Sequence, residues 1–536
     1  MCFSSLILRI SARLVYKLTC FGNISVLFLG CCGAGDGCPS LATLRSVNLD
    51  AATVGEILGV RVPSEVQVSG VTHDSREVRP GFAFVAVPGF RRDGAEFAAE
   101  ASERGASLVL AEKDLQLSPS VIVPDARVAL ADLACAVYGN PSEKLEIFGV
   151  TGTNGKTTTA YALHAILSHT YGTEACGLMT TAETICAGTR RPAGRTTPEA
   201  PEVQETLAEM VENGVKKVVM EVSSHGIALR RIAGTRFSGA LFTNLSRDHL
   251  DLHGTMEAYY ETKRQLFHLA NGPKLANADD EWGVRLAREV EGVGTFGESK
   301  EADYRVEEVR SGPQSTFFAL RHNGGLLETE SPLLGGYNLL NVAGAAALAL
   351  EIGVVEASVG RAVRQMPQVP GRFERIESNR EFEIIVDYAH TDVGLAAVLE
   401  VARNVAGRAR ADGPAGRVIC VFGAAGDRDG AKRPLMGKVA ADLADWSIIT
   451  TDDAYSEEPG RIAREVSAGA DPGSSEIVLD RREAIRKALC RAEPGDVIVV
   501  AGKGHERVQH LPHGAVTFHD ASVVCELLNE LGKEDR

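Results

Sequence analysis

The chain has 536 residues, a formal net charge of −15 and an apolar content of 44%. This length exceeds what one hydrophobic core can organise and predicts about three domains. The acidic balance without a basic patch argues against nucleic-acid binding. No apolar run reaches the roughly 18 residues of a membrane-spanning helix, so no stable membrane association is expected. The cysteines after Cys38 show no CxxC spacing, which suits free thiols in a reducing compartment. We therefore expect a cytoplasmic protein.

Residues 1–46 read as an addition to the first domain. Basic residues precede VLFLGCCGAG, which is superficially similar to a bacterial lipoprotein signal. Gly22 and Asn23 interrupt the apolar stretch of such a signal. We favour a translation start near Leu44 or Val47. Residues 1–46 are then a non-native or disordered extension, and SVNLDAATVGEILG is expected to contain the first helix.

A first domain is expected over residues 47–143. In VSGVTHDSREVRPGFAFVAVPG, two alternating runs predict strands on either side of a turn at Arg79–Gly81. The polar segment His73–Arg76 is most simply a solvated loop. Phe90–Gly94 follows the end of a predicted strand.

The stretch LEIFGVTGTNGKTTT, residues 145–159, predicts a buried strand, a glycine turn and the start of a helix. This is the layout of a phosphate-binding loop, in which backbone N–H groups and the helix N-terminus face phosphate oxygens. Lys156 would neutralise the terminal phosphates of ATP, and the Thr157 hydroxyl would bind Mg²⁺. A glycine turn that binds nothing needs neither of these side chains. The loop is predicted to consist of Gly152, Thr153, Asn154, Gly155, Lys156, Thr157 and Thr158.

Charged side chains follow two further strands predicted in the central part of the chain. VKKVVMEVSSHG predicts a strand that ends near Glu221, and ALFTNLSRDHLDLHG predicts one that runs towards His249. Ligands of α/β sheets bind at the carboxyl ends of strands, so this carboxylate and this imidazole are candidate Mg²⁺ ligands. Solvated loop residues, or a buried His–Asp pair, are the alternatives.

Two helices of the central domain carry polar residues of interest. MEAYYETKRQLF predicts a helix with Tyr259, Tyr260 and Phe267 towards the core, where Lys263 is most simply a surface residue. LLGGYNLLNVAGAAALAL predicts an Ala-rich helix that Asn338 could cap.

A last domain is expected over residues 370–536. VPGRFERI reads as a linker, and the runs EIIVDYAHT, VICVFGAAGDRDGAKRP, WSIITTDDAYSEEP and DVIVVAGKGHE each predict a strand that ends in charged residues. Strands that alternate with helices indicate an α/β domain.

The ordered set DSR, GTNGKTTT, MEVSSHG, NLSRDHLDLHG, YNLLN, VPGRFE, DYAHT, GDRDGAKRP and AGKGHE resembles the Mur ligase family from about Val47 to the C-terminus. The resemblance implies a three-domain α/β fold. Its parts would be a UDP-substrate domain over 47–143, an ATP-binding domain over 144–369 and a Rossmann-like amino-acid-binding domain over 370–536. The central sheet would be mostly parallel, with helices on both faces.

The resemblance also implies an activity. A monomeric, ATP-dependent ligase would add a diamino acid to UDP-N-acetylmuramoyl-L-alanyl-D-glutamate through an acyl phosphate, in peptidoglycan precursor synthesis. Mg²⁺ would assist, and Lys263 would be carbamylated to N6-carboxylysine.

By the same resemblance, functional residues are carried over by motif. The catalytic residues would be Lys156, Lys263, His249 and Asp387. The metal ligands would be Thr157, Glu221, His249 and carbamylated Lys263. Adenine contacts would come from Asn338 and Asn341. The UDP-muramyl substrate would contact Ser75, Phe90, Arg91, Arg92, Thr196, Thr197, Ser223 and Arg231. The amino acid would contact Arg428, Asp452, Asp453, Ala454, Tyr455, Gly502 and Glu506. The family often has glutamine where this chain has Leu229, which puts one polar contact in doubt.

One departure bears on the amino acid. Family members that add meso-diaminopimelate usually carry Asp-Asn-Pro-Arg where this chain has Asp452–Tyr455, so the arginine for the distal carboxylate is missing. Asp453 and Glu457 would make the local field more negative and favour a lone ammonium group. We therefore expect lysine, ahead of ornithine, over diaminopimelate. The alternative is the same reaction with meso-diaminopimelate, with Arg428 or Lys503 supplying the missing charge.

Two other functions compete with this one. A folylpolyglutamate synthetase-like ligase shares the fold, but its phosphate loop should lie close to the start of the chain. A nucleotide-binding subunit without catalysis would not need Glu221, His249, Lys263 and Asp387 together.

Overall fold

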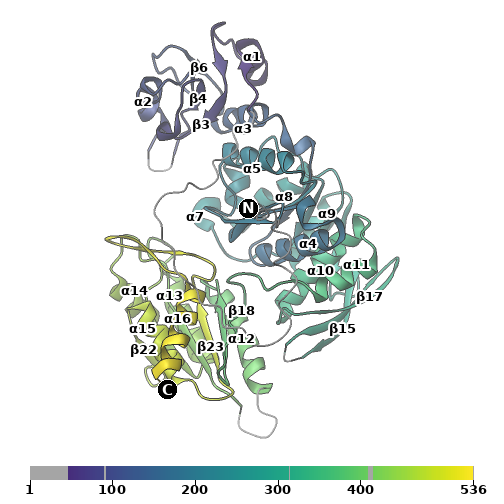
Figure 1. The fold of residues 1–536 in the computed structure, drawn as a ribbon, viewed down its shortest axis with the longest axis vertical. Coiled ribbons are helices and arrows are strands. Elements are labelled where there is room, and N and C mark those ends of the chain that lie inside the picture. Colours follow the sequence, from purple (N-terminus) through teal and green to yellow (C-terminus); the bar gives the residue numbers. More distant parts are fainter. Residues whose placement is uncertain (1–45, 90–91, 313, 409–414, 535–536) are drawn as a thin grey trace, which may run out of the picture. The chain divides into compact units, whose positions relative to one another are not determined.

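Three large β-sheets with covering helices carry the fold of the computed structural model, which describes residues 46–89, 92–312, 314–408 and 415–534 (Figure 1). The extension predicted for residues 1–46, apart from its last residue, lies outside the described chain. The predicted contacts of Phe90 and Arg91 lie outside it too. Among the described residues, no helix is both long enough and apolar enough to cross a membrane.

The first large sheet is parallel, in the order β3-β4-β5-β6. Its strands are β3 (Gly70–Thr72), β4 (Phe82–Val85), β5 (Leu108–Ala111) and β6 (Ser120–Ile122). A small pair, β1 (Leu49–Asp50) and β2 (Gln67–Val68), precedes it. Helix α1 (Ala51–Leu58) begins at Asp50, whose side chain accepts a hydrogen bond from the Thr53 N–H, as is typical of an N-cap. The other α-helices here are α2 (Ala98–Glu103) and α3 (Ala126–Val137).

The central sheet has 11 strands in the order β10-β9-β8-β11-β7-β12-β13-β14-β15-β16-β17. The run from β8 to β15 is parallel, and antiparallel strands extend both edges. The strands are β7 (Glu146–Thr151), β8 (Cys176–Met179), β9 (Glu183–Cys186), β10 (Thr189–Pro192), β11 (Lys217–Glu221), β12 (Gly239–Phe242), β13 (Lys274–Asn277), β14 (Val293–Gly297), β15 (Tyr304–Ser311), β16 (Thr316–His322) and β17 (Gly325–Ser331).

Helices cover both faces of this sheet, as the alternation along β7 shows. Phe148 and Val150 pack in one hydrophobic cluster with α4 (Lys156–Tyr171), α10 (Gly336–Glu351) and α11 (Glu356–Arg364). Ile147 points to the other face, towards α5 (Ala200–Glu212), α8 (Met256–Leu269) and α9 (Glu281–Glu289). The short helices α6 (Ser224–Ala228) and α7 (Leu250–His253) follow β11 and β12. The predicted α/β class, with a mostly parallel central sheet, is therefore confirmed.

The last large sheet runs in the order β18-β19-β23-β20-β21-β22 and is parallel except at β18. Its strands are β18 (Glu374–Arg375), β19 (Glu383–Asp387), β20 (Val418–Phe422), β21 (Trp446–Ile449), β22 (Ser475–Ile477) and β23 (Val497–Ala501). The helices are α12 (Asp392–Arg408), α13 (Lys432–Leu443), α14 (Pro459–Ser467), α15 (Arg481–Arg491) and α16 (Asp520–Glu534). A hairpin of β24 (Val508–Leu511) and β25 (Gly514–Thr517) precedes α16.

This topology positions the candidate site. Strands β11, β7 and β12 are neighbours and run parallel, so their carboxyl ends meet at one edge of the central sheet. Residues 152–158, 221–225 and 243–253 lie at these ends, in the last residue of β11, the following loops and the first turns of the helices. Sites of open α/β sheets form at such an edge.

Candidate functional site

The glycine loop after β7 has a backbone that only glycine can supply. Gly152 and Gly155 have φ angles of 150° and 81°, in the region that side chains disfavour. A Cβ atom at Gly152 would overlap the Thr243 hydroxyl, and one at Gly155 would overlap the Asn341 side-chain amide. Helix α4 begins directly after this loop, with its first-turn N–H groups free of side-chain caps. An anion could therefore bind at this N-terminus.

Glu221 is the carboxylate around which the polar groups of this edge gather. Its side chain is 2% exposed. It accepts hydrogen bonds from the Thr157 hydroxyl at 2.9 Å and the Thr181 N–H at 3.1 Å, and Lys156 Nζ lies 4.0 Å away. Burial lowers the pKa of Lys156, and the charge of Glu221 opposes that shift. A lysine and a carboxylate therefore share one desolvated site beside the glycine loop.

Lys263 is buried, so the surface position expected from composition alone is wrong. The residue is 1% exposed, its Nζ atom donates a 2.6 Å hydrogen bond to the Gly152 carbonyl, and it lies 4.6 Å from the centre of the Tyr259 ring. Burial, together with the neighbouring charge of Lys156, holds the pKa of Lys263 well below its usual value. Helix α8 therefore places Lys263 against the Gly152 carbonyl of the glycine loop, where burial favours the neutral amine.

His249 follows β12 at the same edge, in a left-handed backbone conformation with φ 52°. Its ring centre lies 4.7 Å from that of His225, and its Nε2 atom lies 3.4 Å from an Asp248 carboxylate oxygen. Both partners of this pair are partly exposed, so the alternative of a buried His–Asp pair is wrong. Desolvation lowers the pKa of His249 to about 4. The imidazole is therefore neutral at pH 7, as a metal ligand must be.

Asn338 and Asn341 are buried in the first turns of α10. The Asn338 amide donates to the Leu334 carbonyl at 2.8 Å, and Asn341 accepts from the Thr159 hydroxyl at 3.3 Å. The helix begins at Gly336 with Gly335 in the cap position. Asn338 therefore lies inside the helix, and its predicted role as the cap is wrong.

The residues predicted to hold the muramyl group form a network joined to Glu221. The Thr197 hydroxyl donates to the Glu221 carbonyl at 3.2 Å and accepts from the Ser223 N–H at 3.0 Å. Arg231 donates to the Thr197 carbonyl at 3.1 Å. The Thr196 hydroxyl accepts from Thr181, which also contacts Glu221. The substrate-side and loop-side groups are thus connected through one residue, Glu221, by its backbone carbonyl and its carboxylate.

Two predicted uridine contacts lie in the first large sheet and its loops. The buried Ser75 hydroxyl donates to Glu100 at 3.0 Å. Arg92 forms an exposed ion pair with Glu96 at 2.8 Å. Both side chains have local partners, which a ligand would have to share or displace.

A cleft of about 800 Å³ brings residues from the central sheet together with residues from the last sheet. The predicted residues that line it are Thr153, Asn154, His249, Arg428, Asp452, Asp453, Tyr455, Gly502 and Glu506. Ala454 does not line it, because it is fully buried in the core of the last sheet, and its contact with the amino acid stays a prediction. The glycine loop and the predicted amino-acid residues therefore face one space.

The acids of this cleft are largely paired. Lys503 is fully buried, and its Nζ atom lies 2.8 Å from both Asp453 and Glu506. Burial alone would lower the pKa of Lys503, but the surrounding carboxylates raise it. Glu457 pairs with Arg433 at 2.8 Å. Asp453 and Glu457 therefore each have a buried cation as partner, but Lys503 also pairs with Glu506 and Arg433 also pairs with Glu465. The effect of these acids on the local field stays a prediction.

Asp387 ends β19 and is 7% exposed. Its carboxylate accepts from the Phe373 N–H at 2.6 Å and the Ala389 N–H at 2.7 Å. Burial raises its pKa, and the nearby Arg372 opposes that shift. In this structure Asp387 joins the backbone of the linker, at Phe373, to the segment after β19, at Ala389, and it does not line the cleft.

Sequence reasoning missed two cations at the site. Arg372 donates to the Thr157 hydroxyl at 3.2 Å and lies 4.5 Å from the centre of the Tyr388 ring, while its buried Nε atom has no partner. Lys432 lines the cleft and donates to the His390 carbonyl at 2.9 Å. Arg372 lies in the motif VPGRFE and Lys432 in the motif GDRDGAKRP, so these motifs could have identified both residues.

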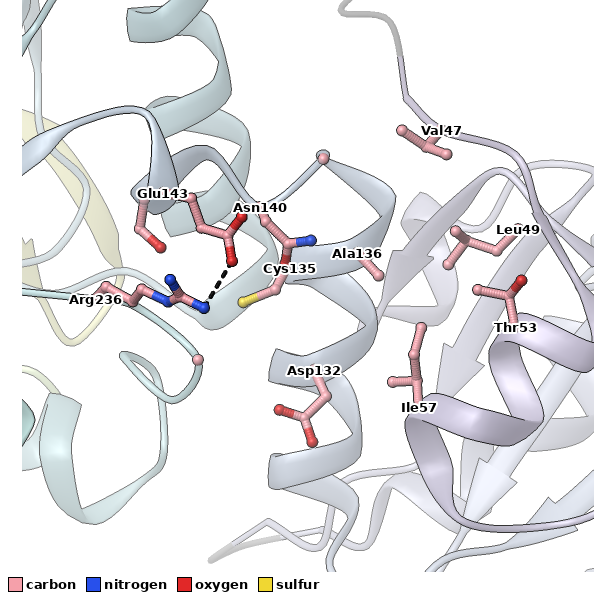
Figure 2. Close-up of a pocket in the computed structure, with 13 residues that line it drawn as sticks. Val47, Leu49, Thr53, Ile57, Asp132, Cys135, Ala136, Asn140, Glu143 and Arg236 are labelled. Atoms are coloured by element: carbon pink, nitrogen blue, oxygen red, sulfur yellow. Dashed lines mark ion pairs between the residues drawn. The ribbon is translucent and has the colours of Figure 1, made fainter.

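A second cavity, of about 560 Å³, lies near α1 and α3 and contains none of the predicted residues (Figure 2). Its charged groups are partly paired, as in the 2.8 Å ion pair between Arg236 and Glu143. The Cys135 thiol points towards the Ala233 carbonyl, and burial raises its pKa to about 12. We assign no function to this cavity.

Comparisons with known proteins match this architecture along the chain. The model described as "Mur ligase family, catalytic domain" matches residues 67–146, "Mur ligase middle domain" matches 150–349, and "Mur ligase, glutamate ligase domain" matches 371–504. These matches and the fold define an ATP-dependent ligase. The chain belongs to the Mur ligase family.

Individual relatives are similar over nearly their whole lengths. The UDP-N-acetylmuramoyl-L-alanyl-D-glutamate–2,6-diaminopimelate ligase of Solibacter usitatus is 40% identical over 501 residues, which cover 89% of this chain and 99% of the relative. The protein of that name from Gloeobacter violaceus is also 40% identical, over 88% of this chain and 96% of its own. A solved structure of a ligase of this name is 29% identical, with a TM-score of 0.63, and covers 91% of this chain and 100% of its own.

A more distant structure bears on the folate alternative. The folylpolyglutamate synthase of Mycobacterium tuberculosis is 17% identical, with a TM-score of 0.56, over 70% of this chain and 92% of its own. At this identity the likeness shows a shared fold alone.

Proposed function

We propose that this enzyme adds meso-diaminopimelate to the glutamyl carboxylate of UDP-N-acetylmuramoyl-L-alanyl-D-glutamate. The observation that carries the proposal is Arg428 in the cleft. Among the described residues it has no carboxylate within ion-pair distance, while nearby Lys503 is committed to two acids. Diaminopimelate differs from lysine by a second carboxylate, which requires an available cation.

The relatives support the same choice. Those at 40% identity are named for 2,6-diaminopimelate. The missing arginine and two acids, Asp453 and Glu457, favour lysine in the sequence, but each of these acids lies 2.8 Å from a cation that it shares with a second acid. Diaminopimelate, the alternative left open by the sequence, is therefore the substrate we favour. Tyr455, which is uncharged in place of the family's arginine, is the feature that still favours lysine.

The reaction follows from the groups at the edge of the central sheet. The glutamyl carboxylate would attack the γ-phosphorus of ATP, ADP would leave, and the amine would then displace phosphate from the acyl phosphate. Lys156 would stabilise the charge on the transferred phosphoryl group. Asn338 and Asn341 would lie beside the adenine. Thr197 and Arg231 would help to hold the muramyl group.

The residues present suit a divalent cation. Thr157 and Glu221 offer a hydroxyl and a buried carboxylate in contact, and His249 is a neutral imidazole. Lys263 could add a further oxygen ligand as a carbamate, since its lowered pKa favours the neutral amine that reacts with CO₂. When bound, Mg²⁺ would neutralise phosphate charge during the transfer.

The test is the mass of the product. The full chain is incubated with ATP, Mg²⁺, the muramyl dipeptide and an equal mixture of lysine, ornithine and meso-diaminopimelate. We expect the diaminopimelate product to dominate. A lysine product in excess would overturn the choice of amino acid, and release of phosphate only with a folate and glutamate would overturn the reaction.

A further inference from the structure

The aromatic ring of Tyr455 lies against both an arginine and a histidine. It stacks on His510, with ring centres 5.2 Å apart and planes inclined by 14°. The guanidinium carbon of Arg428 lies 5.4 Å from the centre of the Tyr455 ring. This distance falls within the range of a cation–π interaction. Three side chains from three separate segments thus form one Arg428–Tyr455–His510 stack at the cleft.

The backbone that carries Tyr455 is fixed by the hairpin of β24 and β25. Tyr455 has φ 49°, and its N–H donates to the His510 carbonyl at 3.1 Å. The His510 N–H in turn donates to Asp453 at 2.9 Å. The buried Gln509 amide donates to the Thr451 carbonyl at 3.1 Å. A non-glycine residue keeps a positive φ only where its surroundings impose it, and here the hairpin does so.

The acids on either side of Arg428 contact other groups rather than its guanidinium, and Asp429 lies 3.9 Å from Arg247. Asp427 accepts from the Ser456 hydroxyl at 2.6 Å, and Asp429 accepts from the Ala431 N–H at 2.9 Å. Among the described residues, the Tyr455 ring is the contact recorded for the guanidinium of Arg428. An aromatic face orients a guanidinium without neutralising it.

We propose that the stack of Tyr455 on His510 positions Arg428 to receive the second carboxylate of the diamino acid. This inference rests on the proposed function. Tyr455 and His510 are positioning residues that act through Arg428. In this chain the oriented Arg428 would bind the distal carboxylate, in place of the arginine that family members carry at the position of Tyr455.

The experiment measures kcat and KM of the full chain for meso-diaminopimelate and for lysine, with ATP and the muramyl dipeptide saturating. Tyr455→Leu removes the ring and should raise the KM for diaminopimelate about fivefold, the effect of one lost cation–π contact. The KM values for lysine, ATP and the dipeptide should stay unchanged. Tyr455→Phe keeps the ring and should recover most of the loss. The matched control is Tyr171→Leu. Tyr171 lies at the end of α4, is exposed, and its ring also contacts a cation, Lys217 of β11.

A second variant covers the case in which Tyr455→Leu fails to fold. His510→Leu removes only the support of the ring and should raise the same KM, with rescue by His510→Phe. If the KM values for diaminopimelate and lysine rise equally, or neither changes, the positioning role is overturned while the proposed function stands. A wild-type enzyme that ligates lysine but not diaminopimelate would overturn the proposed substrate and this inference together.

Discussion

The Nζ atom of Lys263 donates a 2.6 Å hydrogen bond to the carbonyl oxygen of Gly152, a residue 111 positions earlier in the chain. The contact ties helix α8 to the glycine loop after β7. The lysine is 1% exposed, and burial holds its pKa well below the usual value, which favours the neutral amine. A buried lysine of this kind needs either a hydrogen-bond acceptor or a chemical modification.

Replacing Lys263 by alanine should abolish most of the ligase activity, because the site would lose the anion that the proposed carbamate would provide. Small carboxylates such as acetate or formate should restore part of the rate by occupying the vacated space. The measurement is phosphate release with and without added acetate. Lys217→Ala, which changes a lysine paired with Glu146, is the control. A fully active Lys263→Ala variant would reject the role.

Lys156→Ala should abolish ligation for a different reason. Lys156 Nζ donates to the Thr153 carbonyl at 2.8 Å and lies 4.0 Å from Glu221. Losing one such electrostatic contact to the transition state costs on the order of 3 kcal/mol, or more than about a hundredfold in kcat. Acetate should not rescue this variant, which separates it from Lys263→Ala. Near-normal turnover would remove the assignment of the ATP loop.

Arg428→Gln should separate the two candidate amino acids. Removing the guanidinium leaves the second carboxylate of diaminopimelate unpaired, so kcat/KM for that substrate should fall at least tenfold, or about 1.4 kcal/mol. Lysine lacks this carboxylate, and its kcat/KM should change little. Conversely, Tyr455→Arg should raise diaminopimelate activity relative to lysine. Parallel losses for both substrates in Arg428→Gln would place the arginine in a general structural role.

A chain that begins at Val47 should be soluble and fully active. The described structure from this point has its own contacts, since the Val47 N–H donates to the Val137 carbonyl at 2.7 Å and Leu49 pairs with Val68. Steady-state kinetics and a thermal melt of the shortened chain against the full chain are the measurements. Loss of folding on truncation, or a lipidated native protein in the membrane fraction, would show that residues 1–46 belong to the working protein.

Acid should destabilise the fold partly through His505. Burial lowers its pKa from 6.5 to about 3, so between these values the unfolded chain binds a proton that the folded chain excludes. The free energy of unfolding therefore falls as the pH drops below about 6.5, and at pH 5 this single group contributes a loss of about 2 kcal/mol. Urea unfolding at pH 7.5 and 5 should show a smaller pH effect in His505→Gln than in wild type. His169→Gln, on the exposed side of α4, should keep the wild-type pH effect.

The sequence determined the parts whose physics is local. A run of apolar residues followed by a glycine loop and Lys-Thr specifies a strand, a turn and a helix through contacts between near neighbours, and β7, the loop and α4 follow that order. Parallel strands also place their carboxyl ends together, so the sequence alone assigns Glu221 and His249 to one edge of the sheet. The family was identified from the order of the motifs, each of which is short and continuous.

Only the tertiary structure decided which charges are free. Lys263 reads as a surface residue in its helix but lies under the glycine loop, because the helix face that carries it packs against the sheet. Asp453 reads as an unpaired acid, yet Lys503, 50 residues later, pairs with it and with Glu506. Arg433 pairs with both Glu457 and Glu465, whereas the guanidinium of Arg428 lies over the Tyr455 ring. Desolvation and ion pairing depend on long-range packing, so the charge of the cleft could not be read from the order of its residues.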